Sequence, residues 1–332
     1  MGFGYDPDKD VPDLSGKVIL ITGGKLLSHL VSLNENLILM KTNADERLLI
    51  GTSGIGKTAI LELAKHNPAH IYFTGRNEKA AAEVVSQCAV SSNITFLPCE
   101  LDSFKSIRDA AAKFRHDRLD VFVANAGILA VPPAVTKDGY EIQFGVNHVG
   151  NAALLLRLLP IMLRTAREVQ GADVRFVAVS SNGYMTHPMN GIDFDTLRST
   201  QENLLFGKWA RYGQSKLANV LLARELGKRY PQITSLAIHP GVVRTEMVTG
   251  LGVLDRMLIF AMSPLGLMTP REGAFNTLWA ATSPDVKGRV DAETALFEPV
   301  GKPHGGDGKC RSDELSKKLW EWTVKEVGVE AE

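Results

Sequence analysis

Two residues of this chain, Tyr212 and Lys216, have the types and the spacing of an acid and base pair. Side chains four residues apart on a helix share one face, so the phenol and the ammonium can point toward one site. A phenol with a pKa near ~10 exchanges protons poorly at neutral pH, and a neighbouring ammonium stabilises the phenolate and lowers that pKa. Two of the six tyrosines, Tyr5 and Tyr212, have a lysine four residues on, and of these only Tyr212 opens an apolar helical run. The pair predicts proton transfer, although the spacing alone also fits a solvated surface pair.

The rest of the chain alternates apolar runs with helical periodicity, and these elements must position the pair. Strands are predicted at residues 17–22, 71–76, 94–99, 120–124, 174–179, 234–239 and 296–300. Helices are predicted from residue 53 onward and at 106–114, 141–163, 212–230, 271–281 and 313–327. The alternation predicts a single doubly wound Rossmann-type α/β domain over residues 1–332, with a mostly parallel seven-stranded sheet.

A glycine-rich turn after the first strand would seat a pyrophosphate at a helix N-terminus, but its two halves are separated in this chain. The halves are Gly23 and Gly24 on one side and Ser53, Gly54, Ile55 and Gly56 on the other. Removing residues 25–51 joins them into one continuous turn, so we interpret this segment as an insertion, with an unspliced intron as its origin. A genuine insertion loop is the alternative, because closing it costs only about 2 kcal/mol of entropy. In either case we expect the 332-residue chain to bind a dinucleotide poorly.

Residues 51–58 also match GxxxxGK[ST], the phosphate loop of nucleoside triphosphatases. Such a loop needs a later strand that ends in an Asp for Mg²⁺. The two candidate strands lead instead to Asn125 and Ser180. A nucleotide hydrolase is therefore a less favoured alternative.

Arg76 stands at the end of the second predicted strand, where an enzyme that uses NAD would carry an acidic residue for the ribose 2′-hydroxyl. A guanidinium suits a 2′-phosphate instead, which predicts NADP (NADPH) as the cofactor. The alternative is an ordinary surface arginine at a strand end.

The motifs of the chain, taken in order, resemble those of the short-chain dehydrogenase/reductase family. They are the split glycine turn, Asn125-Ala-Gly127, Val146-Asn147-His-Val-Gly150, the Ser180-Ser181 pair, Tyr212-Gly-Gln-Ser-Lys216 and Pro240-Gly241. The stretch from Tyr212 to Val220 is most similar to the retinol-dehydrogenase-like branch. That resemblance implies an NADP(H)-dependent oxidoreductase that interconverts a small apolar alcohol and its aldehyde or ketone.

The resemblance also implies a role for each matching residue. Tyr212 would donate or accept the proton, and Lys216 would lower its pKa and hold the nicotinamide ribose. Ser181 would polarise the carbonyl oxygen, and the backbone carbonyl of Asn147 would hold a relay water. The implied cofactor contacts are Glu100, Leu101 and Asp102 at the adenine, where either carboxylate could act, Asn125 and Gly127 under the cofactor, and Pro240, Val242 and Thr245 at the nicotinamide.

The composition of the chain indicates which kinds of binding partner to expect. The formal net charge is +0 and 22% of the residues are charged, which predicts no bulk attraction to nucleic acid. The three cysteines lack metal-ligand spacing, and no apolar run reaches the ~18 residues of a membrane span. We expect a cytoplasmic protein without a metal or an integral membrane segment. Residues 247–269 are predicted to form a lid over the substrate, and the alternatives for this segment are core packing or weak membrane contact. The resemblance suggests a homodimer or homotetramer, and a non-catalytic NADP-binding or scaffold protein remains an alternative because of the insertion.

Overall fold

The computed structural model describes residues 4–23, 54–88, 93–244, 252, 255, 267–291 and 296–328. The strands are β1 (Val18–Thr22), β2 (His70–Gly75), β3 (Ile94–Pro98), β4 (Val121–Ala124), β5 (Val174–Val179), β6 (Ile233–Ile238), β7 (Leu296–Glu298) and β8 (Lys302–His304). The main helices are α2 (Ile55–Leu63), α3 (Glu78–Ser86), α4 (Phe104–Ala111), α6 (Asn151–Glu168), α7 (Gly207–Arg229), α10 (Pro270–Thr282) and α11 (Asp313–Val327). Shorter elements are α1 (Pro7–Asp10), α5 (Ile142–Phe144), η1 (Ala64–His66), η3 (Gly145–Gly150), η4 (Asn182–Thr186), η5 (Phe194–Thr196) and η6 (Pro284–Gly288).

The strands form one sheet in the order β3-β2-β1-β4-β5-β6-β7-β8. Strands β1 to β7 pair in parallel, and β8 alone runs antiparallel, against β7. The predicted doubly wound, mostly parallel sheet is confirmed, with one strand more than expected. The additional strand β8 has the sequence Lys-Pro-His, which carries no apolar pattern by which it could be found.

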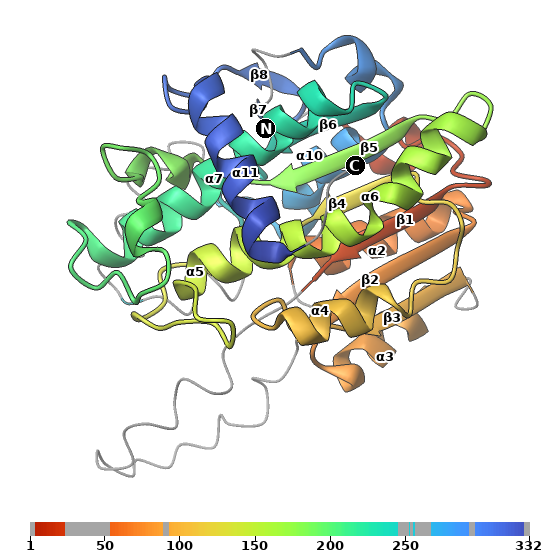
Figure 1. Ribbon diagram of the computed structural model, residues 1–332. Coiled ribbons are helices and arrows are strands. Elements are labelled where there is room, and N and C mark those ends of the chain that lie inside the picture. Colours follow the sequence, from red (N-terminus) through yellow and green to blue (C-terminus); the bar gives the residue numbers. More distant parts are fainter. Residues whose placement is uncertain are drawn as a thin grey trace.

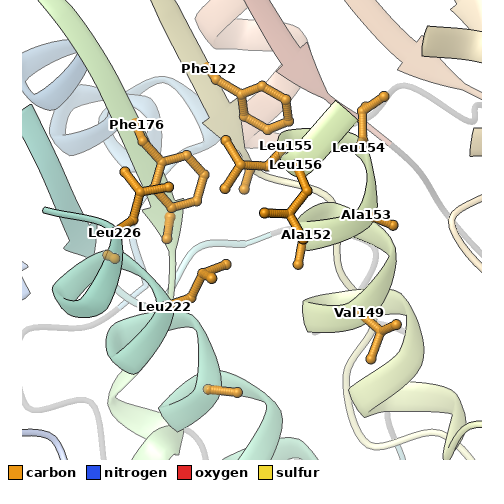
Figure 2. Close-up of a cluster of buried hydrophobic side chains, with 14 of the residues drawn as sticks. Phe122, Val149, Ala152, Ala153, Leu154, Leu155, Leu156, Phe176, Leu222 and Leu226 are labelled. Atoms are coloured by element: carbon orange, nitrogen blue, oxygen red, sulfur yellow. The ribbon is translucent and has the colours of Figure 1, made fainter. Parts of the chain in front are cut away.

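Helices cover both faces of the sheet, so its central strands are buried on both sides (Figure 1). One apolar cluster joins the sheet to α4, α6, α7 and α11, and the other joins it to α2, α3 and α10. Figure 2 shows the first cluster, in which Phe122 and Phe176 of the sheet face leucines of α6 and α7, among them Leu155 and Leu222. This packing fixes the position of α7, the helix that carries Tyr212 and Lys216.

The helix predicted over residues 141–163 is built from three pieces, because the π-helical turn η3 separates α5 from α6. The combined helix Ile142–Glu168 is long and apolar enough to cross a membrane by length and composition. Its most apolar window is 78% buried inside the protein, which is the pattern of a core helix.

At the end of the sheet opposite the candidate site, Asp120 is completely buried and accepts a hydrogen bond of 2.9 Å from the backbone N–H of Val18. Arg118 donates to both of its carboxylate oxygens at 2.7 and 2.8 Å, and Lys17 approaches to 3.3 Å. These contacts hold the starts of β1 and β4 side by side.

Several sequence predictions fall outside the described residues. They concern residues 25–51, most of 247–269, and the cofactor contacts expected from Gly24, Ser53 and Thr245.

Candidate active site

The candidate residues converge on one edge of the sheet because parallel strands present their carboxyl ends together. Gly23 follows β1, Arg76 follows β2 and Asn125 follows β4. Ser181 comes two residues after β5, and Pro240 comes two residues after β6. The strand order reverses between β1 and β4, and ligands of open α/β sheets bind at such a point.

The described parts of the split glycine turn are shaped for close approach. Gly54 is the N-cap of α2 with a φ of 82°, and no side chain among the described residues caps this helix N-terminus, which is the kind of position where an anion binds. A Cβ on Gly56 would lie 2.5 Å from the side-chain nitrogen of Asn125, and one on Gly23 would lie 2.8 Å from the carbonyl of Thr74. The residues present therefore fit the pyrophosphate of a dinucleotide.

At the ends of β2 and β3, Arg76 lies within electrostatic reach of Asp102 and Glu100, while burial lowers the pKa of its guanidinium. Lys137, which sequence reasoning missed, forms an ion pair with Glu100 and lies 4.0 Å from Asp102. Burial raises the pKa of Asp102, and its Oδ1 is buried without a hydrogen-bond partner. Of the three candidates for the adenine contact, Asp102 thus offers the unsatisfied acceptor, whereas Glu100 is occupied. Leu101 instead packs against Gly150, where a Cβ would collide with its carbonyl.

The turn after β4 is tied to the end of β1. The hydroxyl oxygen of Thr22 accepts hydrogen bonds of 3.0 Å from the backbone N–H groups of Asn125 and Ala126. A Cβ on Gly127 would come within 3.1 Å of Oδ1 of Asn147 and 3.3 Å of Nζ of Lys216. The glycine therefore lets this turn lie directly beside two of the candidate catalytic residues.

Tyr212 lies in α7 with only 7% of its surface exposed. The loop after β5 covers its ring, since a Cβ on Gly183 would lie 2.6 Å from the ring carbon Cε1. Burial raises the pKa of Tyr212 to about 12, and a hydrogen bond from Ser181 acts in the opposite direction. The other serine, Ser180, donates to the backbone carbonyl of Lys216 at 2.8 Å. Ser181 is thus the serine that meets the phenol.

Lys216 does not lower the pKa of Tyr212 in this structure, contrary to the sequence-based expectation. Its Nζ lies 5.7 Å from the centre of the Tyr212 ring and donates a 3.0 Å hydrogen bond to the carbonyl of Val179. Burial lowers the pKa of Lys216 itself to about 8. The shared helix face was predicted correctly, but burial dominates the pKa of both groups.

Asn147 lies within η3 and is completely buried. Its Oδ1 accepts from the N–H of Ile128 at 2.7 Å, and its Nδ2 donates to the carbonyl of Ile128 and to Oγ of Ser215, each at 2.9 Å. Ser215 in turn donates to the carbonyl of Tyr212 at 2.7 Å. The asparagine is therefore connected to the helix that carries the phenol.

After β6, Pro240 is buried, and the carbonyl of Val242 accepts from the N–H of Met268 at 2.9 Å. The backbone of Gly241 has a φ of 87°, and a Cβ there would collide with the Met268 side chain. This segment, which carries the predicted nicotinamide contacts Pro240 and Val242, is thus held against the chain just before α10.

His148 was expected on a helix surface and instead is completely buried, with Nε2 3.0 Å from Oγ1 of Thr323 in α11. Burial lowers its pKa to about 3. Sequence reasoning also missed the buried ion pair between Arg211 and Glu141, in which Nε and Oε1 are 3.1 Å apart. Its signal was the Arg directly before Tyr212, in a helix otherwise rich in apolar residues. Among the described residues, no group of three or more His, Cys, Asp or Glu side chains could hold a metal ion.

Comparison with known proteins gives the family. The profile of the family described as short chain dehydrogenase matches residues 48–191, a stretch that begins after β1. A Schizosaccharomyces pombe protein named as an uncharacterized oxidoreductase is 34% identical, covering 95% of this chain and 86% of its own. The short-chain dehydrogenase/reductase drtF of Aspergillus calidoustus is 31% identical and covers 96% and 95%. Human polyprenol dehydrogenase is 33% identical over 72% of each chain.

Solved structures share the fold. A protein of uncharacterised function from Mycobacterium paratuberculosis has a TM-score of 0.70 at 24% identity, with 99% of each chain covered. The Pseudomonas aeruginosa RhlG/NADP active-site complex has a TM-score of 0.60 at 21% identity, covering 87% of this chain and 96% of that one. With the sequence relatives, these comparisons show that the chain belongs to the short-chain dehydrogenase/reductase family, whose members are oxidoreductases that use a nicotinamide cofactor.

Proposed function

We propose that this chain is an NADP(H)-dependent oxidoreductase of the retinol-dehydrogenase-like branch that interconverts an apolar alcohol and its aldehyde or ketone. One observation carries the proposal. The buried phenol of Tyr212 meets Ser181 in the same site that holds the buried amine of Lys216.

A bound nicotinamide would supply or accept the hydride, and the protein residues manage the proton and the oxygen. With its pKa raised to about 12, Tyr212 stays protonated at neutral pH and can donate its proton to a carbonyl oxygen during reduction. The hydroxyl of Ser181 polarises the same oxygen by hydrogen bonding. Lys216 would hold the nicotinamide ribose, and the carbonyl of Asn147 would anchor the relay water.

The preference for NADP(H) is supported by Arg76 at the end of β2, with Lys137 close by. Both cations neighbour the carboxylates of Glu100 and Asp102, so a 2′-phosphate would have to compete with them for the cations. Replacing Arg76 with Ser should therefore weaken NADPH binding more than NADH binding. Similar losses for both cofactors in a fluorescence titration would argue against this assignment.

An apolar substrate is supported by the human polyprenol dehydrogenase among the relatives and by the loop between β5 and α7. Four large apolar side chains on this loop are exposed by half or more of their surface; they are Met185, Met189, Leu205 and Phe206. The same loop places Gly183 against the Tyr212 ring, so an apolar substrate bound there would meet a loop that carries exposed apolar side chains.

The test is an NADPH oxidation assay with apolar aldehydes and ketones, run on the 305-residue chain that lacks residues 25–51. Tyr212→Phe should abolish turnover but leave NADPH binding largely intact, because only the hydroxyl is lost. Tyr230→Phe, at the other end of α7, is the matched control and should stay active. Turnover that survives Tyr212→Phe would refute the proposal.

A non-catalytic NADP-binding or scaffold role is the second candidate for the 332-residue form. It is supported by the family match, which begins at residue 48, within the 25–51 segment. The matched part therefore leaves out Gly23, which belongs to the first half of the glycine-rich turn. An NADPH titration of both chain lengths distinguishes the candidates: tight binding by the long form would remove this one. Sequencing the cDNA across codons 20 to 60 tests the intron origin, which a message of the long form alone would disprove.

A further inference from the structure

Asn151, the first residue of α6, makes four side-chain hydrogen bonds although only 2% of its surface is exposed. Its Oδ1 accepts a 2.6 Å hydrogen bond from the hydroxyl of Thr22, the last residue of β1. Its Nδ2 carries two hydrogens and lies within hydrogen-bond distance of three backbone carbonyls, those of Ala126 at 3.1 Å, Val146 at 3.2 Å and Asn147 at 3.1 Å, so one hydrogen is shared between two of them. One amide therefore joins β1, the turn after β4 and the π-helical turn.

The π-helical turn explains why the carbonyl of Asn147 uses a side-chain donor. In a regular α-helix the backbone N–H of residue 151 would bond the carbonyl of Asn147. Here that N–H bonds the carbonyl of His148 instead. The carbonyl of Asn147 is therefore not paired with the N–H of residue 151, its partner in a regular α-helix, and a buried carbonyl needs a donor in its place. The side chain of Asn151 provides the replacement.

We propose that Asn151 is a positioning residue, whose amide holds the carbonyl of Asn147 at a fixed orientation relative to the end of β1. This inference rests on the proposed function, in which the carbonyl of Asn147 anchors the relay water. A carbonyl oxygen has two lone pairs, so it can accept from Asn151 and still hold a water. Through Thr22, the same amide links the relay to the strand from which the cofactor turn begins.

The test compares Asn151→Ala with Asn151→Ser, which differ by one oxygen. A serine in a helix can donate to the carbonyl four residues earlier, and for position 151 that carbonyl belongs to Asn147. Thr165→Val is the matched control, because Thr165 is buried in the same helix and bonds Leu119 and Ile161 at the other end.

The first measurement is hydrogen exchange of the segment 142–151 in the full chain, followed by mass spectrometry without any cofactor. Asn151→Ala should speed exchange there about tenfold, the change that corresponds to one net hydrogen bond. Asn151→Ser should remain close to the unmodified protein, and Thr165→Val should leave this segment unchanged. Exchange in Asn151→Ala equal to that of the unmodified protein would overturn the proposal.

The second measurement is the split between kcat and KM in whichever chain length turns over NADPH. Asn151→Ala should lower kcat about tenfold with KM for NADPH within twofold, and Asn151→Ser should recover most of the loss. Equal kcat values for the two variants would contradict a positioning role. Failure of the proposed function would appear differently, as turnover that persists in Tyr212→Phe, and the exchange experiment does not depend on turnover.

Discussion

Replacing Lys216 with Met should make the protein more stable while abolishing turnover. The side chain is 95% buried, and the hydrogen bond from its Nζ goes to the carbonyl of Val179. A buried ammonium loses most of its hydration, and one carbonyl is a poor substitute for water. Met has a similar length and no charge, so it can fill the same space without that loss.

The size of the effect follows from the pKa of Lys216, which burial lowers from 10.5 to about 8. Since a tenfold change in proton affinity corresponds to 1.36 kcal/mol, a charged amine at this position costs about 3 kcal/mol of folding free energy at pH 7. Below pH 8 both the folded and the unfolded chain carry the proton, and the cost is complete. Between pH 8 and 10.5 the folded chain gives up its proton first, so the cost disappears as pH rises.

Urea unfolding followed by tryptophan fluorescence, at pH 7 and pH 10, measures both values. We expect Lys216→Met to exceed the unmodified protein by about 3 kcal/mol at pH 7 and by much less at pH 10. Lys105→Met is the control, because Lys105 is 79% exposed beside Asp109 and should change stability little at either pH. A Lys216→Met protein that is less stable at pH 7, or whose advantage is the same at both pH values, would refute the reasoning.

Three further predictions concern other parts of the molecule. In the 305-residue chain, Gly56→Ala should weaken NADPH binding about tenfold or more, because its Cβ would lie 2.5 Å from the side chain of Asn125. An unchanged dissociation constant in a titration would contradict this prediction. His148→Gln should make stability less sensitive to acid. The pKa of His148 is about 3 in the folded chain and 6.5 ordinarily, so falling pH protonates the unfolded chain first and lowers the free energy of unfolding by about 2 kcal/mol by pH 5. The same loss of unfolding free energy between pH 7 and pH 5 in both proteins, measured by urea unfolding, would contradict this. Asp120→Ala should lower the unfolding free energy by about 2–3 kcal/mol, because it leaves Arg118 and the Val18 N–H unpaired, whereas a loss below about 1 kcal/mol would show that water replaces the carboxylate.

The strands were predictable because helices cover both faces of the sheet. Side chains on both sides of a central strand are therefore buried and mostly apolar, which gives short runs rich in Val, Ile and Phe. The π-helical turn at Gly145–Gly150 was not, since one extra residue in a turn leaves the apolar periodicity on either side almost unchanged. The strand Lys302–His304 was missed for a different reason, because its position depends on pairing with β7 and not on burial.

Within the candidate site, residue spacing predicted which side chains share a face but not how they titrate. Tyr212 and Lys216 lie on one face of α7 as expected, yet burial moves the pKa of each toward its neutral form. The environment of a helix residue depends on which other element covers it, and α11 closes over His148 from the far end of the chain. Lys137 was missed similarly, because its carboxylate partners come from a distant strand end.

The two outermost strands of the sheet, β3 and β8, each contain a proline, Pro98 in the first and Pro303 in the second. Proline has no N–H to donate, and Lys302 next to Pro303 adds a charge that an incoming apolar strand would have to desolvate. Neither border of the sheet is therefore a good template for adding a strand from another molecule. If copies of this protein associate, we expect them to do so through helix surfaces. Fibril formation by addition of strands to the sheet edges should be disfavoured while the protein remains folded.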